Sequence, residues 1–560
     1  MLTRCNSLVR GHSAVRTEVI ERIASLLMYE ITPVVPLRGS ISASGDLSPL
    51  SYIAGVIEGS PDIFVRVGKG TQKTMNAQQA LQEFNLPPIT LAAKEGLGLL
   101  NGTAFSAATA SLAMYQAQEL AVFSQALTAM GVESLQGSAE SFYPQIAAMR
   151  PHPGQIESAQ NISAFLQGSL LAQGLAGTKD TTSSGLYQDR YALRTASQWI
   201  GPQLEDLIQA QEQLRVELNS TTDNPLIDTE NDEILHGGNF QAAVVTSTMD
   251  RTRLCIEKFG KLLFAQATEI INPATSKGLP ANLCADDPST SYTCKGIDIN
   301  MAAYTSELGF LANPVGNHVN SAEMHNQALN SLALISARYT LQALDVLYQM
   351  TAAYLFVACQ ALDLRVLQIE FLVAAKQGFQ QTWNSTLARW DSGDDVLIHK
   401  VWDRINSVWP TTTTLDLKQR CKVTTEATIA DIVQHFSAFE PSTIPQPATV
   451  TAFTNSLQST FEQTYNIKRG EIFQSTQTVT PKYLGRVSKA MYNFVRGELG
   501  IKLHRGLVEH PTQPAPEWMH DDDAEQRKTI GNQVSIIFEA LRDRRASKPL
   551  MNVVSGILAK

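Results

Sequence analysis

The stretch SISASGDLSPLSY, residues 40–52, places three small residues, Ala43, Ser44 and Gly45, directly before an apolar run. It follows ITPVVPLRG, whose two prolines end the preceding helical pattern and stiffen the chain that leads to the triplet. The stretch therefore predicts irregular backbone that opens into a helix. Loops of this kind, held by a rigid scaffold, often carry functional groups.

These three residue types suit an internal cyclisation, in which the Gly45 nitrogen attacks the Ala43 carbonyl carbon and two waters are lost. Gly45 has no Cβ, so its nitrogen can approach a carbonyl two residues back in a conformation that other residues resist. Ser44 can lose its hydroxyl to leave an exocyclic alkene, and Ala43 is small enough not to crowd the ring. The product is a methylidene-imidazolone, an electrophile made from backbone that needs no metal.

An ordinary structural interpretation accounts for the same residues. With average composition, an Ala-Ser-Gly triplet occurs by chance roughly once in every few chains of this length. Ser44 would then be a helix N-cap and Gly45 a turn residue. The triplet alone does not decide between the two interpretations.

Composition describes a chain that can bury a large core. Its 560 residues are 44% hydrophobic and 17% charged, which is typical of a soluble globular protein. The net charge of −9, without a Lys/Arg cluster, predicts no nucleic-acid partner.

Cysteine usage and the absence of a long apolar run predict a cytoplasmic protein without a membrane partner. The six cysteines lack metal-ligand spacing and fit buried, structural thiols in a reducing compartment. The first residues contain no apolar signal-like core, and the longest uncharged run, 346–362, is short for a membrane span.

Helical periodicity dominates the chain and predicts an all-α fold, an elongated bundle of long helices with functional loops at the helix ends. A strand signal stands out only near 62–68. The clearest predicted helices are 13–29, a long one after Asn101, 203–218, 241–270, a very long one after Asn320, and 531–544.

Changes in composition predict three segments: a core, 1–375, an appended helical region, 376–490, and a C-terminal helical segment, 491–560. The last contains a Pro-rich acidic loop with His510, His520 and three aspartates. We expect this loop to be solvated rather than to bind a metal, and we find no internal repeat.

Several motifs occur in one order along the chain: RGHSAVR, SASGDLSPLSY, EGLGLLNGTAFS, QDRYALRT, STTDNPLID, HGGNFQ, CKG and NPVGNHVNSAEMHNQALNSLALIS. Together they resemble the aromatic amino acid ammonia-lyases, and the fungal phenylalanine/tyrosine ammonia-lyases most closely. The resemblance is strong to about residue 370, weak over 375–490, and returns at LGRVSKAMYNFVRGELGIK. A joint match of this many loops favours the cofactor-forming interpretation of Ala43, Ser44 and Gly45.

The resemblance implies roles for two residues of QDRYALRT. Arg194 is the candidate that holds the substrate carboxylate, since a guanidinium fork matches a carboxylate; its alternative is a structural ion pair. Tyr191 would place a phenol near the substrate amine or the methylidene group; its alternative is a packing tyrosine.

Further pocket residues are implied in the same way. Amides at 101 and 188 would hydrogen-bond around the imidazolone and substrate, the amide at 224 would assist at the carboxylate, and Glu323 would face the amine. Loop capping, core packing and surface ion pairs are their alternatives. If 323 and 327 lie on a helix, they share one face. The implied substrate-binding set is Asn101, Gln188, Arg194, Asn224, Phe240, Lys295, Glu323, Asn326 and Gln327, with Phe240 as apolar wall.

The resemblance also implies a segment that this sequence does not contain. In the family, a tyrosine on a mobile lid loop upstream of RGHSAVR acts as general base, and the residue pair that sets phenylalanine or tyrosine preference lies there too. Loss of a positioned base typically removes ~10² to 10⁴ in rate. The expectation is an incomplete gene product or a degenerate paralogue.

The leading hypothesis is therefore a carbon–nitrogen lyase that converts L-phenylalanine or L-tyrosine to trans-cinnamate or p-coumarate plus ammonia. By resemblance it is a homotetramer whose pockets are assembled from several subunits, with a place in phenylalanine catabolism and phenylpropanoid metabolism. An aromatic aminomutase with the same electrophile and a catalytically silent scaffold subunit remain alternatives. Histidine ammonia-lyase is disfavoured because AEMHNQALNSLALIS follows the pattern of the aromatic enzymes.

Overall fold

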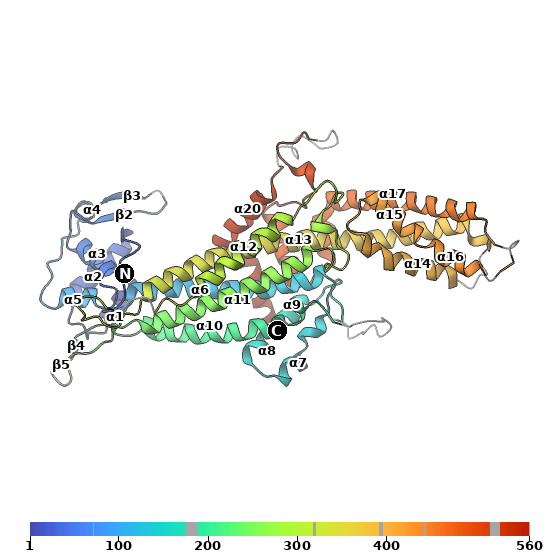
Figure 1. The fold of residues 1–560 in the computed structure, drawn as a ribbon. Coiled ribbons are helices and arrows are strands. Elements are labelled where there is room, and N and C mark those ends of the chain that lie inside the picture. Colours follow the sequence, from blue (N-terminus) through green and yellow to red (C-terminus); the bar gives the residue numbers. More distant parts are fainter. Residues whose placement is uncertain are drawn as a thin grey trace. The chain divides into compact units, whose positions relative to one another are not determined.

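The structure is a computed structural model in which helices dominate and strands are few and short, so the predicted all-α fold is confirmed (Figure 1). The residues that it describes are 1–70, 72–174, 188–316, 321–390, 396–437, 439–440, 444–515 and 527–558. The loop with His520 and the three aspartates lies outside this set.

The chain divides by its contacts into two compact units, each made of three separate segments. Unit 1 comprises Met1–Leu120, Gln203–Lys258 and Ser306–Leu347, and unit 2 comprises Ala121–Pro202, Phe259–Thr305 and Tyr348–Lys560. The predicted boundaries at 375 and 490 stay a prediction, because the units group distant segments rather than consecutive ones.

Long helices contribute residues to both units. Within the described residues these are α6 (Ala104–Ser134), α10 (Ala196–Leu218), α11 (Ala243–Ile271), α12 (Lys295–Leu311) and α13 (Ala333–Thr386). The stretch Glu95–Ser134 is long and apolar enough to span a membrane by length and composition alone, a property that buried core helices share. Its most apolar window is 61% buried.

The N-terminal part of unit 1 packs short helices against a small antiparallel sheet of order β1-β2-β3. Ile31 pairs with Val67, and Val65 with Met75, so that alternate apolar side chains enter the core. The elements are α1 (Leu2–Leu8), α2 (Thr17–Met28), β1 (Ile31–Pro33), α3 (Leu47–Ile57), β2 (Phe64–Val67), β3 (Lys73–Asn76), α4 (Ala77–Glu83) and α5 (Glu95–Leu100).

A hairpin in unit 1 was not predicted. Strands β4 (Leu226–Asp228) and β5 (Glu233–Leu235) pair antiparallel in the loop that precedes α11. Its Asn- and Asp-rich sequence indicates turns, and the three-residue strands are too short to show a period of two.

Unit 2 contains a group of packed helices after α13, namely α14 (Val396–Val408), α15 (Leu417–Glu426), α16 (Ile429–Phe436) and α17 (Pro447–Val479), which lie side by side in Figure 1. Aromatic rings fill this group, and the ring centroids of Phe371 of α13 and Trp409 lie 4.6 Å apart.

The other described helices of unit 2 are α7 (Pro144–Met149), α8 (Pro153–Leu166), α9 (Tyr191–Arg194), α18 (Arg486–Asn493), a π-helical turn (Phe494–Glu498), α20 (Ile530–Arg542) and α21 (Ser547–Leu558). Short 3₁₀ turns lie at Ala139–Phe142, Ala281–Leu283, Ala388–Trp390, Trp409–Thr412, Thr480–Lys482 and Leu507–Glu509.

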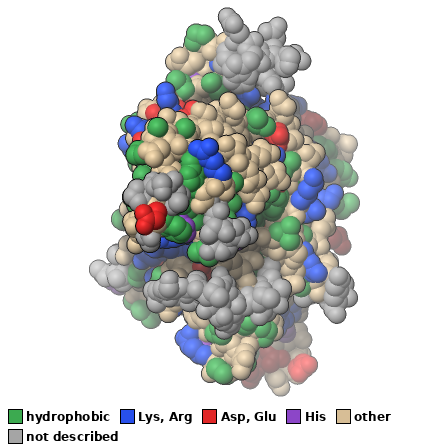
Figure 2. Space-filling view, turned by 90° about the vertical axis from the view of Figure 1, so that its right-hand side faces the viewer, with side chains coloured by type: hydrophobic (Ala, Val, Ile, Leu, Met, Phe, Trp, Pro, Cys, Tyr) green, Lys and Arg blue, Asp and Glu red, His purple; other side chains and the backbone are tan. Residues whose placement is uncertain are grey.

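The cysteines and the surface agree with the composition. All six thiols are free and buried, as predicted. On the face shown in Figure 2, the described basic side chains are interspersed with hydrophobic and uncharged ones. Within the described residues, no group of three or more His, Cys, Asp or Glu side chains is arranged to hold a metal ion.

Candidate active site

The Ala43-Ser44-Gly45 loop is buried in unit 1 at the start of α3. Gly45 has a φ of 74°, and a Cβ at this position would overlap the backbone of Gly102. Glycine is therefore required here both by the left-handed conformation and by the close approach of a second loop. Helix α3 begins at Leu47 with Asp46 at its N-cap position, so the alternative that made Ser44 the N-cap is wrong.

Asp46 fixes the C-terminal side of the triplet. Its side chain is fully buried and accepts hydrogen bonds from Ser42 Oγ (2.8 Å) and from the Ser106 backbone N–H (2.7 Å). Its own N–H donates to the Gly102 carbonyl at 2.8 Å. Burial raises the pKa of Asp46 above its usual value, against the hydrogen bonds that lower it. The sequence analysis gave Asp46 no role, although an acid within an otherwise apolar run was the available signal.

The residues before α13 hold the N-terminal side of the triplet. Ser331 Oγ donates to the Ser42 carbonyl at 2.6 Å, and the Leu332 N–H donates to the Ile41 carbonyl at 2.9 Å. The Leu334 N–H, at the first turn of α13, donates to Ser42 Oγ at 3.2 Å. The triplet is thus held between the start of α13 and the start of α6.

Glu323, Asn326 and Gln327 lie in a turn, which corrects the expectation that 323 and 327 share a helix face. Three consecutive residues, 323–325, have positive φ of 52°, 52° and 70°, and helix α13 begins only at Ala333. Ala322 and Gln327 close the turn through paired backbone hydrogen bonds. The turn nevertheless reaches the triplet, because Gln327 Nε2 donates to Ser44 Oγ at 3.0 Å.

Asn101 and Asn224 meet beside the triplet loop. Asn101 is buried at the end of α5, and its Nδ2 donates to the Asn224 carbonyl at 3.2 Å. Asn224 Oδ1 accepts the Gly237 N–H at 2.7 Å, within the HGGNFQ loop. Phe240 lies half-buried at the end of that loop, and its role as pocket wall stays a prediction.

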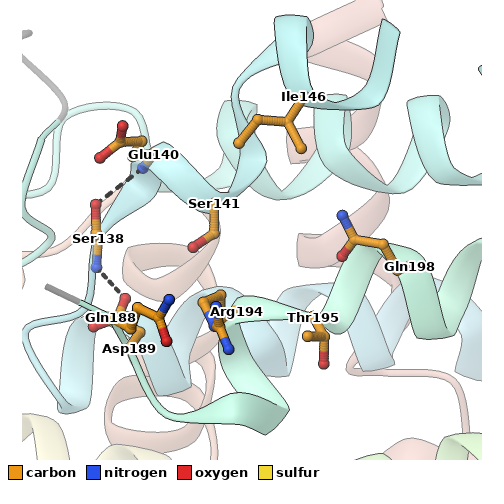
Figure 3. Close-up of a pocket in the computed structure, with 9 residues that line it drawn as sticks. All are labelled: Ser138, Glu140, Ser141, Ile146, Gln188, Asp189, Arg194, Thr195 and Gln198. Carbon is orange, nitrogen blue, oxygen red and sulfur yellow. Dashed lines mark hydrogen bonds between the residues drawn. The ribbon is translucent and has the colours of Figure 1, made fainter. Parts of the chain in front are cut away.

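Gln188, Tyr191 and Arg194 belong to unit 2, where Gln188 and Arg194 line an open pocket of about 470 Å³ (Figure 3). Within the described residues, Arg194 makes no ion pair, and its buried Nε has no hydrogen-bond partner. The structural ion pair suggested as the alternative for Arg194 is therefore not found there. Tyr191 is 71% exposed and its ring centroid lies 5.7 Å from the Arg194 guanidinium carbon, which does not suit a packing tyrosine.

Asp189, a residue that the sequence analysis did not select, anchors this segment. Its carboxylate accepts from the Ser138 backbone N–H, as Figure 3 shows, and pairs with Lys277 Nζ at 3.0 Å. On the other side, Gln266 Nε2 donates to the Ala192 carbonyl at 3.0 Å. Lys295, at the start of α12, stacks over Tyr292 at 4.6 Å and is not among the residues that line the pocket.

Eleven of the thirteen predicted residues form two sets, and Phe240 in unit 1 and Lys295 in unit 2 are placed in neither. The triplet half-site, in unit 1, comprises Ala43, Ser44, Gly45, Asn101, Asn224, Glu323, Asn326 and Gln327. The arginine half-site, in unit 2, comprises Gln188, Tyr191 and Arg194. The first holds a glycine-dependent tripeptide, and the second holds a cation with an unpartnered N–H, as a carboxylate site requires.

A mainly helical scaffold with a buried Ala-Ser-Gly loop in one unit and an arginine pocket in the other fits one class of protein, the ammonia-eliminating lyases that the motifs resemble. Comparison with known proteins supports the same class. The sequence profile of the aromatic amino acid lyases matches residues 1–381, and the chain belongs to this family. The predicted carbon–nitrogen lyase is confirmed.

Individual relatives match nearly the whole chain. Phenylalanine ammonia-lyase hkm12 of Aspergillus hancockii is 48% identical over 569 aligned positions, which cover 100% of this chain and 80% of the relative. A phenylalanine aminomutase (L-beta-phenylalanine forming) of Talaromyces islandicus is 45% identical and covers 100% of this chain and 78% of its own length. The crystal structure of phenylalanine ammonia-lyase from Rhodosporidium toruloides superposes with a TM-score of 0.90 at 43% identity, over 99% of this chain and 82% of that one.

Proposed function

We propose that this protein eliminates ammonia from L-phenylalanine, L-tyrosine or both, to give trans-cinnamate or p-coumarate. The Cα–N bond breaks, the β-hydrogen leaves as a proton, and a Cα=Cβ bond forms, so that ammonia departs with the electron pair of the C–N bond. Support comes from the buried triplet loop whose Ser44 hydroxyl is held by Gln327, and from relatives named phenylalanine ammonia-lyase.

Within this proposal, Ala43, Ser44 and Gly45 form a methylidene-imidazolone, and the surrounding residues fit that group. The backbone of Gly102 occupies the space that a Cβ at position 45 would take, so only glycine fits as the third residue of the ring-forming triplet. Gln327 Nε2, 3.0 Å from Ser44 Oγ, donates to the hydroxyl that must leave as water. Once formed, the group supplies an electrophilic alkene that activates the substrate.

The chain's own side chains bind and orient the amino acid. Arg194 presents an unpartnered Nε–H to the substrate carboxylate, and the exposed Tyr191 phenol beside it faces the substrate amine. Asn101 and Asn224 fix polar groups next to the triplet, and Glu323 accepts a hydrogen bond from the leaving amine. Gln188 adds a polar group to the arginine pocket, and Lys295 would contribute a further cation to the assembled site.

We further propose that the protein is a homotetramer in the cytoplasm, in which a triplet half-site and an arginine half-site from different copies meet. Large apolar side chains exposed on long helices support a second copy as the covering partner, since contiguous apolar surface is seldom left in water. Examples are Leu112 on α6 (61% exposed) and Phe310 on α12 (76% exposed). The buried free thiols suit a reducing compartment.

The test is to incubate the purified full chain with L-phenylalanine or L-tyrosine and to measure ammonia and the arylacrylate absorbance. The peptide that contains residues 43–45 should weigh two waters less than its sequence mass. Ser44→Ala should abolish product and the mass loss while the oligomer stays intact. A folded wild-type oligomer that yields no arylacrylate and an unmodified peptide would establish the silent scaffold instead.

A second candidate function rests on one observation, the 45% identity to a relative named phenylalanine aminomutase. An aminomutase would return ammonia to Cβ. Chromatography of the same reaction for a β-amino acid distinguishes the two activities.

A further inference from the structure

A buried ionic cluster lies behind the triplet half-site, made of Arg4, Lys94 and Asp223, and we call it the Arg4 cluster. Arg4 on α1 is 1% exposed, and its Nη2 lies 3.9 Å from Asp223 Oδ1. Lys94 Nζ lies 2.8 Å from Asp223 Oδ2, and the carboxylate side chain has no exposed surface. One carboxylate therefore faces two cations inside the unit.

The same guanidinium holds the connection between α5 and α6. Arg4 Nη2 donates to the carbonyls of Gly98 and of Asn101, the latter at 2.6 Å. A Cβ at Gly102 would overlap Arg4 Nη1. Arg4 therefore contacts the loop residue whose backbone also abuts Gly45.

Asp223 links Arg4 to the second loop, the one that contains Asn224. Its Oδ1 accepts the N–H of Asn224 at 2.7 Å, and the Asn224 carbonyl in turn accepts from Asn101 Nδ2 at 3.2 Å. Arg4 thus joins the two asparagine loops, directly at Asn101 and through Asp223 at Asn224.

Helix α1 docks on these loops with further polar contacts. Asn6 Nδ2 donates to the Leu218 carbonyl at 2.8 Å, and Ser7 Oγ accepts the Thr222 N–H at 3.3 Å. These bonds place α1 against the segment that ends at Asp223. The backbone of Arg4 is therefore fixed as well as its guanidinium group.

Packing alone does not explain why a charged side chain occupies position 4. Within the described residues, Arg4 Nε and Nη1 are buried without hydrogen-bond partners, and burial lowers the Arg4 pKa to about 10 against the opposing effect of Asp223. An apolar side chain of similar volume would fill the space at a smaller desolvation cost. An apolar side chain could not, however, donate hydrogen bonds to the two loop carbonyls, as the planar guanidinium of Arg4 does.

We propose that Arg4 is a positioning residue, which sets the spacing of the Asn101 and Asn224 amides and holds Gly102 against Gly45. This inference rests on the proposed function, in which both amides and the triplet take part. Arg4 acts on these groups through its contacts with the Asn101 carbonyl, Asp223 and Gly102.

The test uses Arg4→Lys, Arg4→Met and Asp223→Asn in the purified 560-residue chain. Lysine keeps the charge but cannot bridge two carbonyls and a carboxylate with one planar fork. The matched control is Arg22→Met, since Arg22 is also largely buried in unit 1 and donates to the Pro87 carbonyl, away from both asparagine loops.

Amide hydrogen exchange gives the first readout. In all three variants, exchange should rise about 10-fold or more in peptides covering 98–103 and 221–226, and stay unchanged in the peptide covering 53–57 of α3. Arg22→Met should leave 98–103 and 221–226 at wild-type exchange. If Arg4→Met and Arg22→Met affect these two loops equally, the positioning role is overturned.

Steady-state kinetics gives the second readout. Partial unfolding reduces the number of active molecules and leaves KM unchanged, whereas displaced amides should raise KM for phenylalanine about 10-fold in Arg4→Lys. A wild-type KM with only a lower kcat in Arg4→Lys contradicts the proposal. If the wild type forms no arylacrylate, the proposed function fails, and the exchange of the two loops alone decides the role of Arg4. If Arg4→Met does not fold, Arg4→Lys and Asp223→Asn carry the test.

Discussion

Glu133 of α6 carries a carboxyl group that is buried away from solvent. Its side chain is fully buried and accepts the Gly485 N–H at 2.6 Å. Desolvation raises its pKa from the usual 4.5 to about 7, against the opposing effect of the Gly485 hydrogen bond. The folded protein therefore binds this proton more tightly than the unfolded chain.

The sign of the pH effect follows from this raised pKa. The contribution of Glu133 to stability is fully present below pH 4.5 and is lost as the pH rises through about 7. Glu133→Gln keeps the shape and cannot ionise, so between pH 5 and pH 8 the wild type should lose on the order of 3 kcal/mol relative to the variant. Urea unfolding at both pH values measures the difference. Parallel pH profiles would contradict the assignment.

Gly45 can be tested apart from the strain of its backbone. Gly45→Ala should lose the two-water mass difference of the 43–45 peptide and at least about 10² in activity, because a Cβ would overlap Gly102. Gly68 is the control: its φ is also positive, at 93°, but a Cβ there would meet nothing within 4 Å. Gly68→Ala should keep both the mass loss and the activity. Equal losses in the two variants would assign the effect to strain alone.

At the scale of the element, local patterns predicted the helices well. The predicted helix 203–218 is part of α10 (Ala196–Leu218), 241–270 corresponds to Ala243–Ile271, and 531–544 to Ile530–Arg542. Helical periodicity depends on neighbours three or four residues away, so a single sequence is enough to predict these helices.

Elements fixed by distant contacts were missed. The turn 323–327 adopts its left-handed backbone where Gln327 reaches Ser44, 283 residues earlier in the chain, and no local pattern encodes that contact. Strand β1 is three residues long and exists through its pairing with β2. The sequence thus named candidate site residues, but it did not predict the backbone that presents several of them.

Helix α13 is tied to the C-terminal segment by a buried ion pair. Arg496 Nη2 lies 2.8 Å from Asp363 Oδ2, and Thr480 Oγ1 and the Tyr492 hydroxyl donate to Asp363 Oδ1. Asp363→Ala leaves the Arg496 charge buried and uncompensated.

Removing one partner of such a pair typically costs about 3–5 kcal/mol, so Asp363→Ala should unfold well below the wild-type midpoint in a urea titration. Hydrogen exchange should rise in α18. Arg215→Gln breaks an exposed pair with Glu212 and should leave the midpoint unchanged. An Asp363→Ala midpoint equal to that of Arg215→Gln would show that the buried pair contributes nothing to stability.

At the scale of the whole molecule, the two half-sites lie in different units, and in the proposed homotetramer half-sites from different copies would meet. Each half-site is held by helices of its own unit: the triplet loop by the first turns of α6 and α13, and the arginine segment by Gln266 of α11. Sequence reasoning could list the residues of both half-sites, yet it could not separate them, because motif order along the chain does not reveal which segments pack into one unit.

Mixing two inactive variants tests this division. Ser44→Ala removes the triplet half-site, Arg194→Gln removes the arginine half-site, and each variant alone should be inactive. If a site takes its half-sites from different copies, random assembly of a 1:1 co-expressed mixture should give about a quarter of the sites with both intact, and about that share of wild-type activity. Mixing the two purified oligomers without subunit exchange is the control and should stay inactive. Co-expressed oligomers that contain both variants yet remain inactive would show that each chain supplies both half-sites of its own active site.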